Sequence, residues 1–131
     1  MSLRDAILGH VEDRKSDISP VATPEWSEVD GQLGVSKLSS DEADAWEFSL
    51  FREVEGKLRR DMRSMRAKLV VRCLVDRSTG ERVFGDGDVK KVGDLPSDVA
   101  QRIFEAARKH NGLVETAVED ESGNSDDDQS D

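Results

Sequence analysis

Cysteine, histidine and aromatic residues are scarce in this sequence, and each scarcity excludes a class of site. The single cysteine, Cys73, cannot form an intramolecular disulfide or a cysteine-rich metal site. His10 and His110 are far apart, and we expect both at the surface rather than as ligands or an acid–base pair. Two Trp, four Phe and no Tyr leave little material for a large core or for stacking on bases.

Motifs of catalysis and membrane insertion are also missing. The chain has no apolar run of membrane length, no signal-peptide core, no phosphate-binding glycine loop, no nucleophile elbow and no metalloprotease helix. Asp86-Gly87-Asp88 lacks the later residues of a calcium loop, so capping of a short helix is the better interpretation. We therefore expect a cytosolic, non-enzymatic protein without cofactor or metal.

Charge is abundant and unevenly distributed. Of 131 residues, 37% are charged and 35% hydrophobic, which predicts one marginally stable domain with a thin core and a net charge of -10. Residues 57–72 form a basic stretch, composed of Lys57, Arg59, Arg60, Arg63, Arg66, Lys68 and Arg72. The chain beyond Gly112 is acidic and has no base. This asymmetry favours self-screening or self-association.

The N-terminal third predicts a short helix, a linker and a small β-hairpin. Ser2 followed by Asp5 favours a helix through Leu8, and residues 9–23 are polar enough for a connector. Residues 21–29 and 32–38 flank Asp30-Gly31, a dipeptide typical of a two-residue hairpin turn.

Two amphipathic helices are expected in the middle of the chain. Ser39 and Glu42 have capping-box spacing, and the helix that follows, residues 40–55, places Trp46 as a core anchor. A second helix is expected over residues 58–73, although residues 69–75 fit a buried strand as well. Its apolar stripe supplies the candidate partner-binding residues Leu58, Met62, Met65 and Leu69.

The C-terminal part predicts a turn at residues 76–80, a short extended piece at 81–84 and two helices. Asp86 and Asp88 cap the first helix, and Pro96 opens the second, which ends at Asn111-Gly112. The predicted fold is a mainly helical α+β domain, residues 21–113, with the hairpin packed on three or four helices. Residues 1–20 are a short helix and linker, and residues 114–131 a disordered acidic tail.

The order of these segments resembles the tail assembly chaperones encoded by siphophages and prophages. The resemblance covers nearly all of residues 3–113, and its individual elements are unspecific while their succession is persuasive. The segments that carry it are Ser2–Leu8, Pro24-Glu25-Trp26, Leu38–Glu42, Leu74-Val75-Asp76, Gly80–Phe84, Asp86, Asp88-Val89 and Asn111-Gly112-Leu113.

The resemblance implies a non-catalytic role with no active-site residues. Such proteins coat the helical tape measure protein in the host bacterial cytoplasm, keep it soluble, and are shed before the virion matures. Many of their genes also yield a longer product by frameshifting. Two alternatives remain: an acidic DNA mimic that inhibits a host nucleic-acid enzyme, and a small nucleic-acid-binding regulator that uses residues 57–72.

Overall fold

The computed structural model describes residues 2–113, and their fold is α+β, as predicted. Its main sheet is antiparallel with three short strands in the order β1-β2-β5: Ile18–Pro20, Leu33–Ser36 and Leu74–Asp76. Ile18 pairs with Ser36, and Leu33 pairs with Asp76. Residues 18–20, which we expected in the linker, therefore belong to the sheet.

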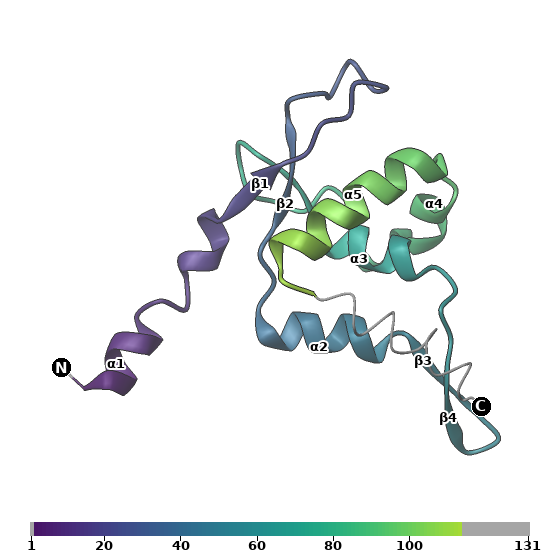
Figure 1. Ribbon diagram of the computed structural model, residues 1–131, viewed down its shortest axis with the longest axis horizontal. Helices are drawn as coiled ribbons and strands as arrows, with labels where there is room; N and C mark the ends of the chain where they lie inside the picture. Colours follow the sequence, from purple (N-terminus) through teal and green to yellow (C-terminus); the bar gives the residue numbers. More distant parts are fainter. Residues whose placement is uncertain (1, 114–131) are drawn as a thin grey trace.

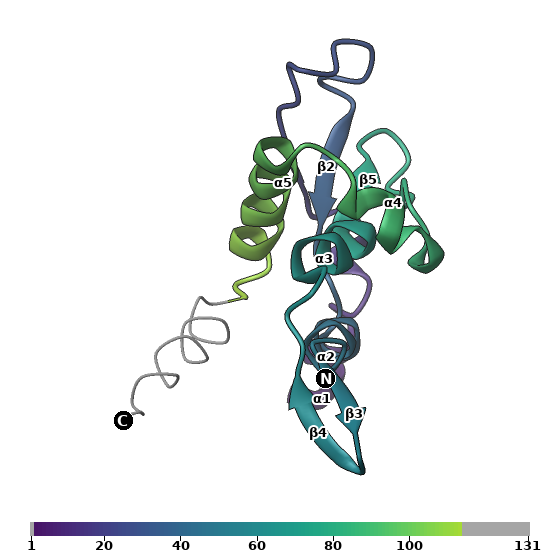
Figure 2. The same cartoon turned by 90° about the vertical axis from the view of Figure 1, so that its right-hand side faces the viewer.

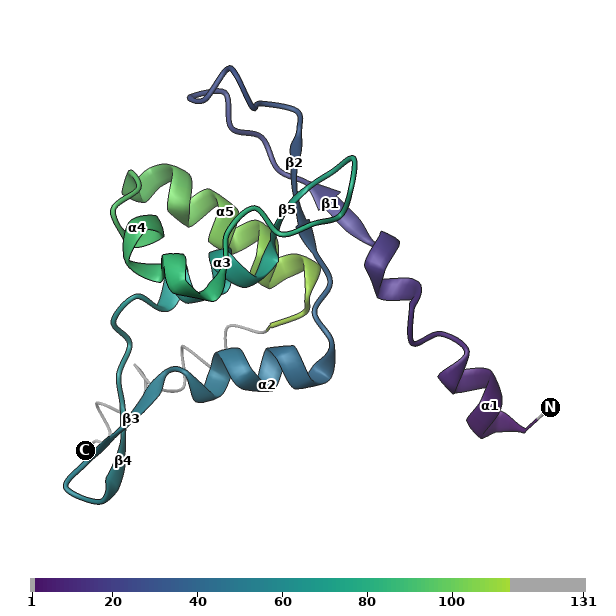
Figure 3. The same ribbon diagram turned by 180° about the vertical axis from the view of Figure 1, so that it is seen from behind.

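The predicted hairpin around Asp30-Gly31 is wrong in its first strand and in its turn. Residues 21–32 form a long loop between β1 and β2 rather than a strand and a two-residue turn (Figure 3). The Asp30 carboxylate accepts a hydrogen bond from the Thr23 backbone N–H at 2.8 Å, which links the two ends of this loop. Gly31 has a positive φ of 88°, but Asp30 does not, so the type I′ geometry is absent there.

The first predicted long helix begins where expected and ends early. Helix α2, Ser40–Phe48, starts at the predicted capping box, in which Ser39 and Glu42 exchange hydrogen bonds. It is followed by a second, two-stranded sheet of β3, Phe51–Val54, and β4, Lys57–Arg60. Glu55 and Gly56 have φ values of 53° and 79°, the paired positive angles of a type I′ turn.

The second predicted long helix is also shorter than expected, because residues 57–60 form β4 of the hairpin rather than the first turns of a helix. Helix α3 spans Met65–Cys73 and passes directly into β5, so the ambiguous residues 69–75 are helix first and strand second. The extended piece after the turn at residues 76–80 reaches β5 through a bridge between Val75 and Arg82.

The C-terminal helices agree with the sequence prediction. A 3₁₀ turn, Asp86–Asp88, leads into α4, Val89–Gly93, and α5 spans Ser97–His110 after Pro96. Gly112 adopts a φ of 62°, and the Leu113 N–H donates to the Arg108 carbonyl at 2.9 Å, which completes the expected C-cap.

The core lies between the three-stranded sheet and helices α3 and α5, which pack on each other and on β2 (Figure 2). Trp46 of α2, only 1% exposed, joins this core and its ring lies 6.5 Å from that of Phe104. The predicted face of α5 is buried throughout, comprising Val99, Ile103, Phe104 and Ala107. Trp46 is thus the core anchor that its spacing predicted.

Two elements project from this body in different directions. The N-terminal arm, residues 2–16, contains α1, Leu3–Leu8, and a 3₁₀ helix, Asp13–Ser16, and leads away from the sheet (Figure 1). The β3–β4 hairpin extends past the end of α2 (Figures 1 and 2). No helix within residues 2–113 is long and apolar enough to cross a membrane. The acidic tail predicted for residues 114–131 falls outside the described residues.

Candidate functional site

The four predicted partner-binding residues do not form one helical stripe. Leu58 lies on β4 and is 64% exposed, whereas Leu69 lies on α3 and is fully buried. Met62 precedes α3, Met65 begins it, and both are half-buried against the core. The stripe prediction is wrong because Leu58 lies on strand β4, which ends at Arg60 before α3 begins at Met65, and because Leu69 belongs to the core.

The two methionines nevertheless share a surface, an open cavity of about 270 Å³ between α3, α4 and the start of α5. Much of its lining is apolar, including Ala67, Val92, Leu95 and Ala100. Small-molecule sites usually measure ~300–1,000 Å³, so this methionine cavity is at the small end of the range and is large enough for a side chain of a partner. Methionine is flexible and polarisable, which allows such a cavity to accept side chains of different shape.

The backbone around the methionine cavity is held by the core and is locally strained. The Trp46 indole N–H donates to the Met65 carbonyl at 3.3 Å, and the Met65 N–H donates to the Met62 carbonyl at 3.2 Å. Ser64, between the two methionines, has a left-handed φ of 60° and makes no side-chain capping bond to α3. Strain of this kind persists where the surrounding structure enforces it and is frequent at binding sites.

A second apolar surface lies on the N-terminal arm. Its large hydrophobic side chains are exposed: Leu3 by 84%, Ile7 by 68%, Leu8 by 49% and Val11 by 56%. The predicted N-cap is present, because the Ser2 hydroxyl accepts from the Asp5 N–H at 3.0 Å. Helix α1 has six residues, far fewer than the ~12–15 at which isolated helices become even marginally stable. We call this surface the apolar arm.

The basic stretch of residues 57–72 is divided between several intramolecular roles. Lys68 donates to the Ser49 carbonyl at 2.6 Å, and Arg66 donates to the Gln101 side chain. Arg63 pairs with Asp61 at 2.8 Å and holds the pKa of that carboxyl well below its usual range. The guanidinium of Arg60 lies over the Phe51 ring, 4.8 Å from its centroid. The structure therefore does not present the stretch as one helical face.

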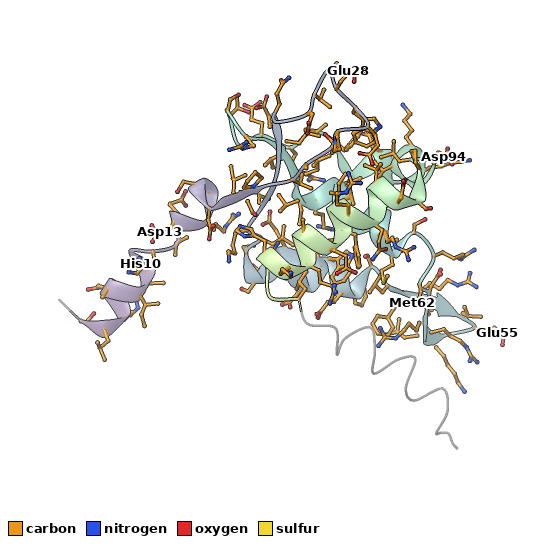
Figure 4. All side chains as sticks on the ribbon, turned by 45° about the horizontal axis from the view of Figure 1, so that its top comes forward. His10, Asp13, Glu28, Glu55, Met62 and Asp94 are labelled. Atoms are coloured by element: carbon orange, nitrogen blue, oxygen red, sulfur yellow. The ribbon has the colours of Figure 1, made fainter. Side chains whose placement is uncertain are left out.

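The titratable candidates are dispersed. His10 contacts Asp13 at 2.6 Å on the arm (Figure 4), whereas the His110 ring contacts the Asp17 carbonyl at 2.9 Å beside the sheet. Cys73 is buried, and desolvation raises the pKa of its thiol to about 12. Within residues 2–113, no three His, Cys, Asp or Glu side chains gather as metal ligands.

Of the two aspartates predicted to cap, Asp88 caps the 3₁₀ turn that leads into α4, whereas the Asp86 carboxylate pairs with Arg82 instead. The Asp88 carboxylate accepts from the Gly85 N–H at 2.9 Å, at the start of the 3₁₀ turn. Asp86 pairs with Arg82 at 2.8 Å, which lowers the pKa of that carboxyl.

Three features of these surfaces were not predicted from the sequence. The exposure of the apolar arm was not predicted, because a short apolar pattern looks the same whether its partner is internal or external. The contribution of α4 and α5 to the methionine cavity depends on tertiary packing, which spacing does not reveal. The β3–β4 hairpin did have a signal, Glu55-Gly56 flanked by short extended segments.

No protein family, curated protein or solved structure matches this chain.

Proposed function

We propose that this chain is a non-catalytic tail assembly chaperone of a long-tailed phage. It binds the helical tape measure protein in the host bacterial cytoplasm, keeps that protein soluble during tail assembly, and is absent from the mature virion. The observation that carries the proposal is the apolar arm, which presents Leu3, Ile7 and Leu8 to solvent on a helix too short to be stable alone. The segment order, which resembles that of tail assembly chaperones, supplies the identity of the partner.

Burial of the apolar arm on a partner provides a driving force for association. Transfer of apolar surface out of water is worth roughly 25 cal/mol per Å², so burying three or four large side chains contributes several kcal/mol. A long helical protein offers repeated apolar ridges on which a short amphipathic helix can pack. One partner can therefore take many copies of the chain, each covering a segment that would otherwise aggregate.

The methionine cavity supports the same function as a second contact. Met62 lies near the β3–β4 hairpin, on the body of the molecule rather than on the arm (Figure 4), and it lines the cavity together with Met65 at the start of α3. A flexible methionine lining tolerates the different side chains that successive segments of a long partner present.

Co-expression with the tape measure protein of the same genome tests the proposal. The wild-type chain should keep the tape measure protein in the soluble fraction, and a variant with Leu3→Ser, Ile7→Ser and Leu8→Ser should not. The matched control is Arg4→Ser with His10→Ser, which changes exposed polar residues of the same arm and should retain the activity. An insoluble tape measure protein with the wild-type chain, or a soluble one with the arm variant, would contradict the proposal.

A second pair of variants separates the methionine cavity from the arm. Met62→Gln with Met65→Gln keeps the side-chain length and adds polarity, and it should reduce the soluble yield of the tape measure protein. Met62→Leu with Met65→Leu conserves volume and apolar character and should retain the yield. Equal yields from the two double variants, with both chains folded by circular dichroism, would show that the cavity does not bind the partner.

A further inference from the structure

The β3–β4 hairpin has one strongly basic face. Its register places Arg52 directly opposite Arg59 and Val54 opposite Lys57. Opposed residues and every second residue of a strand share a face, so Arg52, Lys57 and Arg59 lie together on one side. Like charges directly opposite each other destabilise a strand pair, so this arrangement weakens the hairpin unless an anion neutralises it.

The basic face is poorly neutralised by its surroundings. All three cations are exposed, and Arg52 reaches only Asp61, at 3.5 Å, a carboxylate already held by Arg63 at 2.8 Å. Within residues 2–113, the side chains of Lys57 and Arg59 have no hydrogen-bond or ion-pair partner. The hairpin also projects from the body with Glu55 at its tip, which leaves the face accessible (Figure 4).

The chain itself contains a segment of complementary charge. Residues 115–131 include eight carboxylates and no Lys, Arg or His; they are Glu115, Glu119, Asp120, Glu121, Asp126, Asp127, Asp128 and Asp131. A chain of this length can span ~60 Å at about 3.3–3.6 Å per residue, several times the ~13 Å radius of gyration of a domain of this size. The segment is therefore long enough to reach across a domain of this size from Leu113.

We propose that the acidic segment of residues 119–128 binds the basic face of the β3–β4 hairpin in the same chain. The covalent connection gives the segment a millimolar effective concentration at the face, so individually weak ion pairs suffice. The segment thereby excludes other polyanions, such as nucleic acid, from the hairpin. Nucleic acid itself is the less favoured ligand, because the chain carries a net charge of -10.

This inference is independent of the proposed chaperone function, because it concerns two parts of one chain and its test contains no tape measure protein. A nitroxide label attached to Ser125→Cys in the full-length chain reports on the position of the segment. Cys73 does not compete for the label, because it is fully buried and its thiol pKa is raised to about 12. The wild-type chain treated in the same way serves as the labelling control.

The measurement is the paramagnetic broadening of backbone amide signals in a nitrogen-15 spectrum at low salt. Broadening should be strongest at Arg52, Lys57 and Arg59, and it should fall to the level of the α5 amides when salt screens the ion pairs. It should also be lost in Lys57→Gln with Arg59→Gln. It should persist in Lys90→Gln with Lys91→Gln, which removes the same charge from two exposed lysines of α4.

Three results would overturn the proposal. Hairpin signals that are broadened no more than those of α5 would place the segment elsewhere. Broadening of a nitrogen-15 chain by a labelled chain of natural abundance would assign the face to a second copy. Hairpin signals that ignore the label but shift on addition of a short DNA duplex would assign the face to nucleic acid.

Discussion

Arg102 of α5 donates two hydrogen bonds to the Glu25 carboxylate, from Nη1 to Oε1 at 2.8 Å and from Nη2 to Oε2 at 2.7 Å. This bidentate pair links the helix to the loop between β1 and β2. The same side chain donates to the Ala22 carbonyl at 3.1 Å. Hydrogen bonding to Arg102 lowers the pKa of the Glu25 carboxyl from its ordinary value of 4.5 to about 2. These contacts hold together residues that lie far apart in the sequence.

The Glu25 pair predicts a specific dependence of stability on pH. Because the folded-state pKa is lower than the unfolded one, the pair stabilises the fold above about pH 4.5, and this contribution is lost as the pH falls toward 2. In Arg102→Gln, NMR titration should find the Glu25 pKa raised toward 4.5, with a smaller loss of stability over this range. An unchanged Glu25 pKa in the variant would mean that Arg102 is not the cause of the shift.

Gly34 should tolerate no side chain. A Cβ there would lie 2.6 Å from the Ile18 Cγ2 and 2.9 Å from the Ser19 carbonyl oxygen, closer than real Cβ atoms approach. Gly34→Ala should therefore separate β1 from β2 and lower the free energy of unfolding by about 1–3 kcal/mol, as overpacking usually does. The matched control is Gly93→Ala in α4, where a Cβ meets nothing within 4 Å. Urea denaturation should find the control neutral or stabilised; similar losses in both variants would refute the steric argument.

Trp46 should be the more costly of the two tryptophans to remove. The Trp46 side chain is 1% exposed, whereas Trp26 is half-buried in the loop between β1 and β2. Trp46→Ala should cost about 3–5 kcal/mol and leave a domain of this size largely unfolded. Trp26→Ala should leave a cooperative transition in chemical denaturation. The opposite order of damage would contradict the core described above.

Replacement of Ser64 by glycine should stabilise the protein, because Ser64 has a left-handed φ of 60°. A left-handed conformation costs a residue with a Cβ about 1–2 kcal/mol, and glycine adds an unfolded-state entropy cost of about 0.5–1 kcal/mol. Ser64→Gly should therefore raise the free energy of unfolding by about 0.5–1 kcal/mol. Ser97→Gly, in the regular first turn of α5, lacks the strain and should give a loss instead. A loss at both positions would show that Ser64 carries no strain.

The parts of the fold that the sequence predicted well are those with independent signals at both ends. Helix α5 has a continuous apolar face, Pro96 before it and Asn111-Gly112 after it, so period and boundaries agree. Asn111 does more than its capping signal implied. Its side chain accepts from the Leu38 N–H at 2.6 Å and donates to the Ser36 carbonyl at 3.0 Å, which ties α5 to the end of β2.

The two long helices were predicted to extend too far because apolar spacing does not specify chain direction. Leu50, Val54, Leu58 and Met62 recur every four residues, yet the chain reverses at Glu55-Gly56 within that pattern. Strand β1 was missed because three residues ending in a proline carry almost no periodicity, and its position depends on pairing with β2. The candidate partner-binding site is wrong for the same reason as the second helix, because the helical spacing placed Leu58 and Leu69 on one face although they lie on β4 and α3.

The most direct test of the account is the composition of the complex between this chain and the tape measure protein. Light scattering after size-exclusion chromatography should find many copies of the chain on each tape measure protein. The complex should persist in about 1 M salt, where the Debye length is ~3 Å and exposed charge pairs are screened. The arm variant with Leu3→Ser, Ile7→Ser and Leu8→Ser should elute without the partner. Failure to form a complex, or a complex that dissociates in high salt and is indifferent to the arm variant, would contradict the central claim.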